Sequence, residues 1–485
     1  MILTAAQMVD AERAAFAAGE SAEGLMEIAG RRLAEFVQQF HPLPGTCRVF
    51  AGKGHNGGDV LVAARYLAES GWRIEIEPVF PTQNLAPLTA KQLAALPTKT
   101  SDAPAYPLVV LDGLLGIGST GEPREPVASA IQRINTLRRE KSAWVLAADL
   151  PSALGHHGVE ADATLAMGFA KSSLLDDEAT RFVGRLAIAP LPGVEAPSNA
   201  DPAEVLVAEN LRHLLPPRSF DTHKGTYGRV AILAGSQNYP GAARLCSAAA
   251  VHAGAGLVTL FCPPEISQIL SAAVIPEVMV SPIEDFADVP VEKFTAVAIG
   301  PGLGRERDEM VRDFVRHCAA PCVVDADALN AISESPALLK SCAGPRLLTP
   351  HPLEMERIFP RQNLPRQNLP RRAWLEAFVS EFPVTLLLKG SRTLVGEAGS
   401  ATSYNSTGHP GMGSGGMGDV LTGVCAALLA QGKSPLEAAK LGAWVCGRST
   451  EIALRDGAAS QESLRASDVI DRLGSAFDDL RRNPL

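Results

Sequence analysis

The stretch Asn405-Ser-Thr-Gly-His-Pro-Gly-Met-Gly-Ser-Gly-Gly-Met-Gly-Asp419 decides how the second half of this chain is interpreted. It is a glycine-rich loop that runs into an apolar pattern over residues 420–430, which predicts a buried helix. A helix start carries unpaired backbone N–H groups and the positive end of the helix dipole. Because glycines let a phosphate approach that backbone closely, the loop 415–418 predicts an anion site.

Asp419 stands at the mouth of this predicted anion site. A carboxylate beside a bound anion is electrostatically unfavourable, so its placement needs a chemical reason. A carboxylate that deprotonates a hydroxyl attacking a phosphoryl group supplies that reason. The sequence therefore predicts phosphoryl-transfer chemistry with Asp419 as the catalytic base.

The composition narrows the class of protein. A chain of 485 residues, 46% hydrophobic and 20% charged, is typical of a globular protein with two or three domains. A net charge of −9 argues against nonspecific nucleic-acid binding. The eight cysteines lack zinc-site spacing and are expected to be reduced thiols. Asp10 and Glu12 precede any basic residue and no apolar run reaches spanning length, so we expect a cytoplasmic protein with neither signal peptide nor membrane partner.

Apolar runs alternate with helical patterns along both halves, which predicts an α/β fold with parallel sheets covered on both faces. We expect a first domain over 1–195, a linker over 196–205 and a second domain over 206–485. The repeat of Arg361–Pro365 at 366–370 predicts a surface-loop insertion. The first half predicts a helical stretch over 5–40, a helix over 59–67 and strands over 47–51, 73–80, 108–112 and 144–149; the second predicts strands over 230–234, 257–261, 296–299, 322–325, 346–349 and 384–388.

The first half carries a glycine loop and strand-end acids. Gly52-Lys-Gly54-His-Asn-Gly57 fits the dinucleotide pattern between a strand and a helix, although the same pattern also occurs as a plain tight turn. Asn56 and Asp59 are expected to project from this loop, while Asp112 and Asp149 end two other strands. Open α/β sheets bind ligands at that edge. Each Asp can equally be a strand-end cap, but oxygens converging there could hold a hard cation.

This half resembles the NAD(P)H-hydrate epimerase domain over residues 5–190. The resemblance rests on Gly24–Gly30, His55–Asp59, Asp112 with its glycine loop, and Asp149–Ser152. It implies a Rossmann-like three-layer sandwich in which Asp149 is the acid/base, and in which Asn56, Asp112 and Ser152 hold K⁺. The implied substrate contacts are His55, Asn56, Gly57, Gly58, Asp59, Gly116, Ile117, Gly118, Ser119, Thr120, Gly121, Glu122 and Asp149.

Two residues depart from the epimerase pattern. His55 stands where that family usually has Asn, and it can keep a polar contact or be a simple surface histidine. Ala153 replaces the usual glycine after Ser152. The alanine matters only if its position requires a positive φ.

In the second half, several strand ends are followed by polar or glycine-rich motifs: Gly300–Gly304, Asp325–Asn330, Thr349–Glu354 and Lys389–Thr393. Lys389 and Thr393 suit nucleotide phosphates or ribose, although a lysine there can simply be solvated. His351 suits substrate contact or, alternatively, structural packing. Asp325 and Glu354 suit magnesium bound through water.

This half resembles the ribokinase-like superfamily and, more closely, the ADP-dependent NAD(P)H-hydrate dehydratase, over residues 205–480. The resemblance rests on His223–Gly228, Gly300–Gly304, Thr349–His351, Leu388–Gly390 and Gly416–Leu421. It implies a ribokinase-like three-layer sandwich and Mg²⁺ bound with ADP. Met417 replaces the family's small hydroxyl residue, and we expect a mild effect because the anion site uses backbone N–H groups. The implied nucleotide contacts are Lys389, Gly390, Ser391, Arg392, Thr393 and Gly418, and the implied substrate contacts are Ala242, Ala243, Gly302, His351 and Asp419.

Together the two halves resemble a bifunctional metabolite-repair enzyme. This implies that the first domain epimerises R and S hydrates of NADH and NADPH, NADHX and NADPHX, and that the second dehydrates the S epimer with ADP. A homo-oligomer is also expected. The alternative is an ATP-dependent small-molecule kinase of the same superfamily with a non-catalytic N-terminal binding module. Stable phosphorylated product would identify the kinase, whereas the strand-end polar residues of the first half favour an epimerase.

Overall fold

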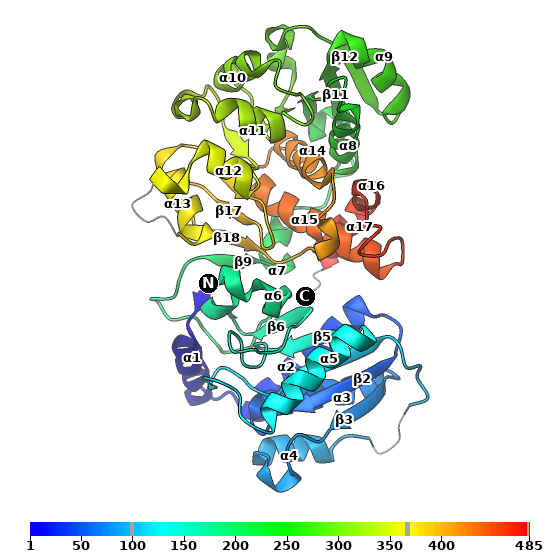
Figure 1. Ribbon diagram of the computed structural model, residues 1–485, viewed down its shortest axis with the longest axis vertical. Helices are drawn as coiled ribbons and strands as arrows, with labels where there is room; N and C mark the ends of the chain where they lie inside the picture. Colours follow the sequence, from blue (N-terminus) through cyan, green and yellow to red (C-terminus); the bar gives the residue numbers. More distant parts are fainter. Residues whose placement is uncertain (98–100, 120, 364–368, 483–484) are drawn as a thin grey trace. The chain divides into compact units, whose positions relative to one another are not determined.

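The computed structural model describes residues 1–97, 101–119, 121–363, 369–482 and 485 of the chain. Contacts divide the chain into two compact units, Met1–Val205 with Leu485, and Leu206–Pro484 (Figure 1). Each unit is built around its own mostly parallel sheet. The predicted α/β class with parallel sheets is therefore confirmed.

The first unit contains a six-stranded sheet in which every pair is parallel. Alternate residues of each strand face opposite sides, so Val109 and Leu111 pack with α2 (Ala22–Phe40) and α3 (His55–Glu69) while Val110 packs with α5 (Val127–Lys141). Burial on both faces explains the continuous apolar runs of these strands. The sheet order is β3 (Arg73–Glu77), β2 (Thr46–Ala51), β4 (Leu108–Gly113), β5 (Trp144–Ala148), β6 (Ala163–Met167) and β8 (Arg185–Ala189).

The N-terminal helical stretch predicted over 5–40 is two helices. Gly19, with φ of +111°, separates α1 from α2, and Ser21 caps the new helix through the Gly24 amide. A small parallel sheet joins β1 (Ile2–Leu3) to β7 (Ala170–Lys171). The helices of this unit are α1 (Ala5–Ala17), α2 (Ala22–Phe40), α3 (His55–Glu69), α4 (Pro87–Ala94), α5 (Val127–Lys141) and α6 (Thr180–Val183).

The second unit is organised by a ten-stranded sheet. The pairs from β12 to β16 are parallel, and β17 turns back antiparallel on β16. The sheet order is β12 (Val278–Pro282), β11 (Leu257–Cys262), β10 (Arg229–Leu233), β13 (Ala296–Ile299), β14 (Cys322–Val324), β15 (Arg346–Leu348), β16 (Thr385–Leu388), β17 (Leu394–Gly396), β18 (Ser403–Asn405) and β9 (Glu204–Leu206).

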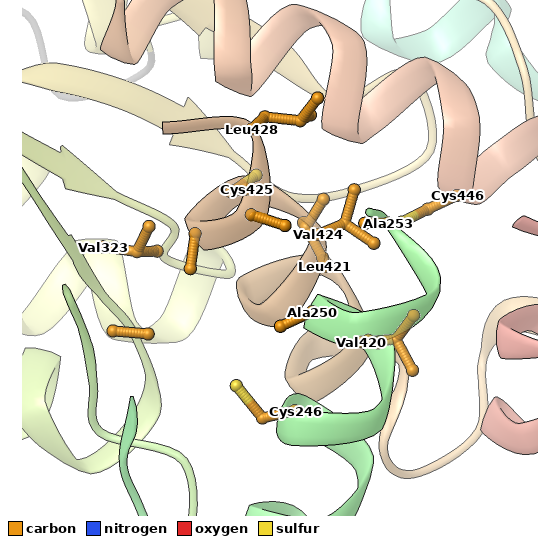
Figure 2. Close-up of a cluster of buried hydrophobic side chains, with 14 of the residues drawn as sticks. Cys246, Ala250, Ala253, Val323, Val420, Leu421, Val424, Cys425, Leu428 and Cys446 are labelled. Carbon is orange, nitrogen blue, oxygen red and sulfur yellow. The ribbon is translucent and has the colours of Figure 1, made fainter. Parts of the chain in front are cut away.

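Helix α14 (Met417–Ala430) lies in the core of the second unit. Its residues from Val420 to Ala430 are all buried, as the apolar pattern predicts. Figure 2 shows Val420, Leu421 and Val424 of this helix beside Cys246 and Ala250 of α8 (Pro240–His252). The other helices are α7 (Ala208–Leu211), α8 (Pro240–His252), α9 (Pro264–Ala273), α10 (Asp308–His317), α11 (Ala326–Ile332), α12 (Pro352–Ile358), α13 (Arg371–Glu381), α15 (Pro435–Arg455), α16 (Ala466–Ile470) and α17 (Leu473–Arg482).

No helix in the described part of the chain combines the length and the apolarity needed to cross a bilayer. Half of the repeated segment 361–370, which the sequence predicts as a surface insertion, falls on residues 364–368, and these lie outside the described residues.

Candidate active sites

The carboxyl ends of neighbouring strands bring the predicted loops of the second unit to one edge. Strands β13, β14, β15 and β16 are adjacent and parallel. They are followed by Gly300, Asp325, Thr349 and Lys389 respectively. Because parallel strands end at a common edge, these residues gather there. The start of α14 reaches the same place, since a Cβ on Gly418 would lie 3.3 Å from the Lys389 Nζ.

The glycine loop before α14 ends one turn earlier than predicted. Gly416 is the N-cap, with φ of +89°, and Met417 and Gly418 already belong to the helix. A Cβ on Gly416 would also lie 2.6 Å from Leu245 Cδ1, so the positive φ and this close side chain both favour glycine at this position. The first bond of the helix runs from Val420 N to Gly416 O. The amides of residues 417–419 precede it and are the donors of the predicted anion site.

Lys389 is the central cation at this edge. Its Nζ lies 2.8 Å from Asp325 Oδ1 and 3.8 Å from Glu354 Oε2. Burial opposes the charge on Lys389, but Asp325 and Glu354 outweigh it and raise the pKa of the ammonium. The second oxygen of Asp325 accepts a 2.8 Å bond from the Thr422 hydroxyl on α14. The ion pair therefore links the end of β14 with the end of β16, and the hydroxyl bond adds the start of α14.

Asp419 projects from the first turn of α14 beside this ion pair. Burial raises its pKa to about 7, with Asp325 adding to the rise and Lys389 opposing it. A carboxylate that titrates near neutrality is well matched to accept a proton in general-base catalysis. The electrostatics thus agree with the role predicted for Asp419.

His351 lies at the same edge and begins α12. Its Nδ1 accepts bonds from the amides of Leu353 and Glu354, and Glu354 Oε2 accepts a bond from the His351 amide. Burial lowers the pKa of His351, and Lys389 lowers it further. Nε2 lies 3.5 Å from Glu354 Oε1, and the side chain is 44% exposed. The structural role and the substrate-contact role considered for His351 are therefore compatible, because its Nδ1 caps α12 while its ring is exposed to a ligand.

The segment 389–393, which is predicted to contact the nucleotide, follows β16 and is hydrogen-bonded by Arg371 of α13. The Arg371 guanidinium donates to the carbonyls of Leu388, Lys389, Ser391 and Arg392 at 3.1–3.4 Å. Sequence reasoning missed Arg371, because nothing local connects α13 with that loop. Within this segment, the Thr393 hydroxyl donates to the Gly390 carbonyl, and Arg392 has a φ of +60°.

The predicted substrate residues at α8 and the Gly300 loop lie together. A Cβ on Gly302 would come within 2.9 Å of the Ala242 Cβ. Ala243, in contrast, is fully buried among the core residues around α14. The motif at His223–Gly228 is at the other edge of the sheet, because it precedes β10 and Gly228 abuts the Ala430 carbonyl at the far end of α14. That end of α14 is about 16 Å from Asp419 along the helix.

In the first unit, the three residues predicted to hold K⁺ form one hydrogen-bonded group. Asp112 Oδ1 accepts a 2.6 Å bond from the Ser152 hydroxyl, and Oδ2 accepts a 2.8 Å bond from the Ser152 amide. Ser152 Oγ accepts from the Leu115 amide, whose carbonyl accepts a 2.9 Å bond from Asn56 Nδ2. Burial raises the pKa of Asp112 to about 6, and the opposing interactions are hydrogen bonds to Ser152 and Leu114, not to a cationic side chain.

This donor set fits a monovalent cation. Carboxylate, hydroxyl and amide oxygens are hard ligands, and the buried Asp112 carboxylate would be balanced by the positive charge of the ion. Among the described residues, no cluster of three His, Cys, Asp or Glu side chains could hold a metal. The K⁺ assignment therefore rests on a mixed oxygen set, and the magnesium assignment on Asp325 and Glu354 also remains a prediction.

The glycines of the Asn-Gly-Gly-Asp segment predict a loop, but in the structure this segment belongs to α3. Helix α3 begins at His55, so Asn56 and Asp59 project from its first turns. Gly57 and Gly58 are buried, and a Cβ at these positions would strike the Gly52 carbonyl or Met26. Glycine is therefore needed at both positions for packing, and any ligand contact from these residues is made by their backbone atoms.

The second predicted substrate loop, 116–122, adjoins Asn56. A Cβ on Gly116 would lie 3.5 Å from the Asn56 Cβ, and the Ser119 amide and hydroxyl both turn back to the Gly116 carbonyl. Glu122 Oε1 lies 3.4 Å from His156 Nδ1 at the exposed end of the loop. Ile117 packs against buried residues of the N-terminal segment. The predicted substrate contact Thr120 lies outside the described residues. Gly118 and Gly121 of the same segment are exposed.

Asp149 is held in an uncommon backbone conformation. Its φ is +66°, and its Oδ1 accepts bonds from the Met167 amide and from the buried Lys171 ammonium. Sequence reasoning missed Lys171, although a single lysine closing an apolar strand pattern was a visible signal. Ala153 nearby has a φ of +57°, so the position where it replaces glycine does require positive φ.

Comparisons with known proteins agree with this two-part layout. A family model described as NAD(P)H-hydrate dehydratase matches residues 230–472, and one described as YjeF-related protein N-terminus matches residues 22–173. Relatives from Gloeobacter violaceus and Moorella thermoacetica are 35% and 33% identical to this chain. Each alignment covers 93% of this chain, with 94% and 91% of the relative, and both relatives are called bifunctional NAD(P)H-hydrate repair enzyme Nnr.

Among solved structures, a ribokinase-like superfamily protein from Enterococcus faecalis V583 matches with a TM-score of 0.50 and 24% identity. The match covers 59% of this chain and 99% of that chain. Fold and sites together define a two-domain α/β enzyme, with a Rossmann-like and a ribokinase-like domain. The sequence matches over nearly the whole chain are more specific. This chain belongs to the family of bifunctional NAD(P)H-hydrate repair enzymes.

Proposed function

We propose that the chain repairs hydrated NADH and NADPH, with its first domain epimerising the R and S forms and its second dehydrating the S form with ADP. The family membership supports this assignment over the kinase alternative, because the relatives named as repair enzymes match both halves of the chain. The observation that carries the dehydratase half is Asp419, with a pKa near 7, on the helix start that offers free amides.

In the proposed dehydration, Asp419 takes the proton from the hydroxyl on the nicotinamide ring. That oxygen then attacks the β-phosphorus of ADP, and the P–O bond to AMP breaks. The amides of 417–419 and the Lys389 ammonium stabilise charge on the transferred group. Phosphate leaves the ring with the C–O electron pair, and loss of a ring proton restores the reduced nicotinamide. The products are NAD(P)H, AMP and phosphate.

Magnesium, where bound with ADP, supplies charge neutralisation of the phosphates, and Asp325 and Glu354 would approach it through water. Lys389–Thr393 and Gly418 contact the nucleotide in this proposal. Ala242, Gly302 and His351 contact the hydrated dinucleotide, and Ala243 contributes through its backbone because its side chain is buried.

For the epimerase domain, we propose that Asp149 moves the proton during inversion at the hydrated carbon. Asn56, Asp112 and Ser152 would hold K⁺, which supplies a fixed positive charge beside the substrate. The segments 55–59 and 116–122 would bind the dinucleotide. Cytoplasmic location and self-association stay predictions.

One experiment tests both activities. The protein is incubated with a mixture of R and S NADH hydrates and either ADP or ATP, and absorbance of reduced nicotinamide is followed. Recovery of the whole mixture with ADP is the expected result, because the epimerase feeds the S-specific step. Recovery that stops at the S fraction contradicts the epimerase assignment, and a stable phosphorylated product with ATP contradicts the dehydratase assignment.

A further inference from the structure

Arg371, at the start of α13, gathers four carbonyl groups of the turn between β16 and β17. Its Nη1 donates to the Ser391 carbonyl at 3.1 Å and to the Arg392 carbonyl at 3.4 Å. Its Nη2 donates to the carbonyls of Leu388 and Lys389, both at 3.3 Å. The planar guanidinium carries five N–H donors in a fixed arrangement, which a lysine ammonium cannot reproduce. One side chain therefore sets the direction of four carbonyls within residues 388–392.

The backbone of this turn is held in conformations that L side chains rarely adopt. Gly390 has a φ of +152°, and Arg392 has a φ of +60°. A Cβ on Gly390 would lie 2.7 Å from Arg371 Nη2, so a side chain at position 390 and the guanidinium would compete for the same space. Unusual backbone conformations persist only where surrounding contacts impose them. The four hydrogen bonds from Arg371 are contacts of this kind.

The first residue of the turn has anchors of its own. The Lys389 amide donates to the Pro350 carbonyl at 2.8 Å, and the Lys389 ammonium donates to Asp325 Oδ1 at 2.8 Å. These two bonds hold Lys389 beside Gly418 at the start of α14 without any contribution from Arg371. The part of the turn whose shape depends on Arg371 is therefore the segment 390–392.

The Gly390 amide is available to a ligand. The peptide bonds of this turn are trans, so the C=O and the N–H of each bond point in opposite directions. Because the Lys389 carbonyl faces Arg371, the N–H of Gly390 in the same peptide is turned away from the guanidinium. Gly390 is exposed, and within the described ranges of the chain its N–H donates to no other residue. Exposed backbone N–H groups of turns are suited to bind phosphate oxygens.

We propose that Arg371 is a positioning residue for nucleotide binding: it draws four carbonyls to one side of the turn 388–392 and so presents the Gly390 N–H to a phosphate oxygen of ADP. The inference rests on the proposed dehydratase function. Arg371 acts through the turn and not on the reacting atoms, and Lys389 keeps its own anchors. Loss of Arg371 should therefore weaken the binding of ADP and leave the turnover of bound ADP largely intact.

The test measures the Kd of ADP with magnesium, and KM and kcat for ADP in the hydrate assay, on full-length variants. Arg371→Met is expected to raise Kd and KM about tenfold, the size of a lost hydrogen bond to a charged group, with kcat within about threefold of wild type. Arg371→Lys keeps the positive charge but not the planar fork, so its Kd should stay about fivefold above wild type.

Arg372→Met is the matched control. Arg372 is the next residue of the same helix, and its guanidinium binds Glu376 at 2.7 Å. All three constants are expected to stay within about twofold of wild type in this variant, because surface ion pairs of this kind contribute little.

Hydrogen exchange reports on the turn itself. Without ligand, the amides of residues 388–394 should exchange faster in Arg371→Met than in wild type, because the hydrogen bonds that hold the turn are gone. ADP should slow exchange of the same residues in wild type, and it should do so less in the variant. If Arg371→Met fails to fold, the Kd of Arg371→Lys still decides.

The inference is overturned if the Kd of Arg371→Met lies within about twofold of wild type. Recovery of the wild-type Kd by Arg371→Lys also overturns it, since charge alone would then be sufficient. A lower kcat at unchanged KM would place Arg371 in the chemistry and reject a role in binding. If wild type binds ADP but does not repair the hydrates, the proposed function is refuted, and the comparison of Kd values still determines the role of Arg371.

Discussion

The two sites use the same pair of residue types at the same kind of place, but they arrange them differently. In the first unit the buried Lys171 binds Asp149, the predicted acid/base itself. In the second unit Lys389 binds Asp325, and Asp419 stands beside the pair with its pKa raised to about 7. A lysine can therefore orient a carboxylate by binding it directly, or it can shift the pKa of a nearby carboxylate while it is bonded to another acid.

The arrangement at Asp419 predicts the largest effect. Asp419→Asn removes the proposed base but keeps the shape of the side chain, so ADP-dependent dehydration should fall about a thousandfold or more. Epimerisation should be unchanged because it depends on the other unit. The rates are measured from nicotinamide absorbance and from chromatographic separation of the epimers. Full ADP-dependent activity in this variant would refute the base assignment.

The reciprocal change is Asp149→Asn. R-epimer conversion should fall about 100-fold to 1000-fold, while the S epimer is dehydrated at the wild-type rate. A mixed-hydrate assay then shows recovery that stops when the S fraction is used up. Loss of both activities together would mean that the variant has damaged the fold, and circular dichroism would detect that outcome.

The pKa of Asp419 can be shifted by a substitution at another residue. Dehydration requires ionised Asp419, so its rate should increase with pH through a midpoint of about 7. Lys389 opposes the rise of that pKa, and Lys389→Met should therefore move the midpoint upward, by about one unit for each 1.4 kcal/mol of lost attraction. The exposed Lys340, which pairs with Glu381, provides the matched control in Lys340→Met. An unchanged midpoint would show that Lys389 does not influence the pKa of Asp419.

The smallest predicted effect concerns the backbone beside Asp149. Ala153 has a φ of +57°, where glycine carries no steric penalty. Ala153→Gly should stabilise the first unit by about 1 kcal/mol, the strain of a non-glycine residue in this conformation less the entropy that glycine adds to the unfolded chain. Denaturant unfolding followed by the fluorescence of Trp72 and Trp144 measures it. A destabilised variant would show that the alanine is accommodated without strain.

The sequence predicted the framework of both sites because buried parallel strands are continuous apolar runs that end in short polar motifs. Asp112, Asp325 and Lys389 were located in this way, each at or just beyond a strand end. Strands β6, β8, β9, β12, β17 and β18 were missed. Three of them, β9, β17 and β18, have only three residues, which is too short for a clear apolar pattern. The break between α1 and α2 was missed because both helices continue the same apolar pattern.

The residues that bind the predicted site residues were the hardest part of the sites to predict from the sequence. Lys171 and Arg371 bind residues between 17 and 22 positions away, so no local pattern connects them with the groups they hold. Asn56, Asp112 and Ser152 were grouped only by resemblance, and hydrogen bonds through Leu115 now bring them together. Which of these side chains touch substrate stays a prediction.

Helix α14 ties the chemistry of the second unit to the integrity of its core. Asp419 immediately precedes eleven consecutive buried residues, so the helix cannot detach without exposing much of that interior. Heating should therefore abolish dehydration in the same cooperative transition that melts the unit, with no earlier loss of the catalytic turn. Amides in the middle of α14 should be among the slowest in the protein to exchange with deuterium, a few residues from the place where the reaction occurs.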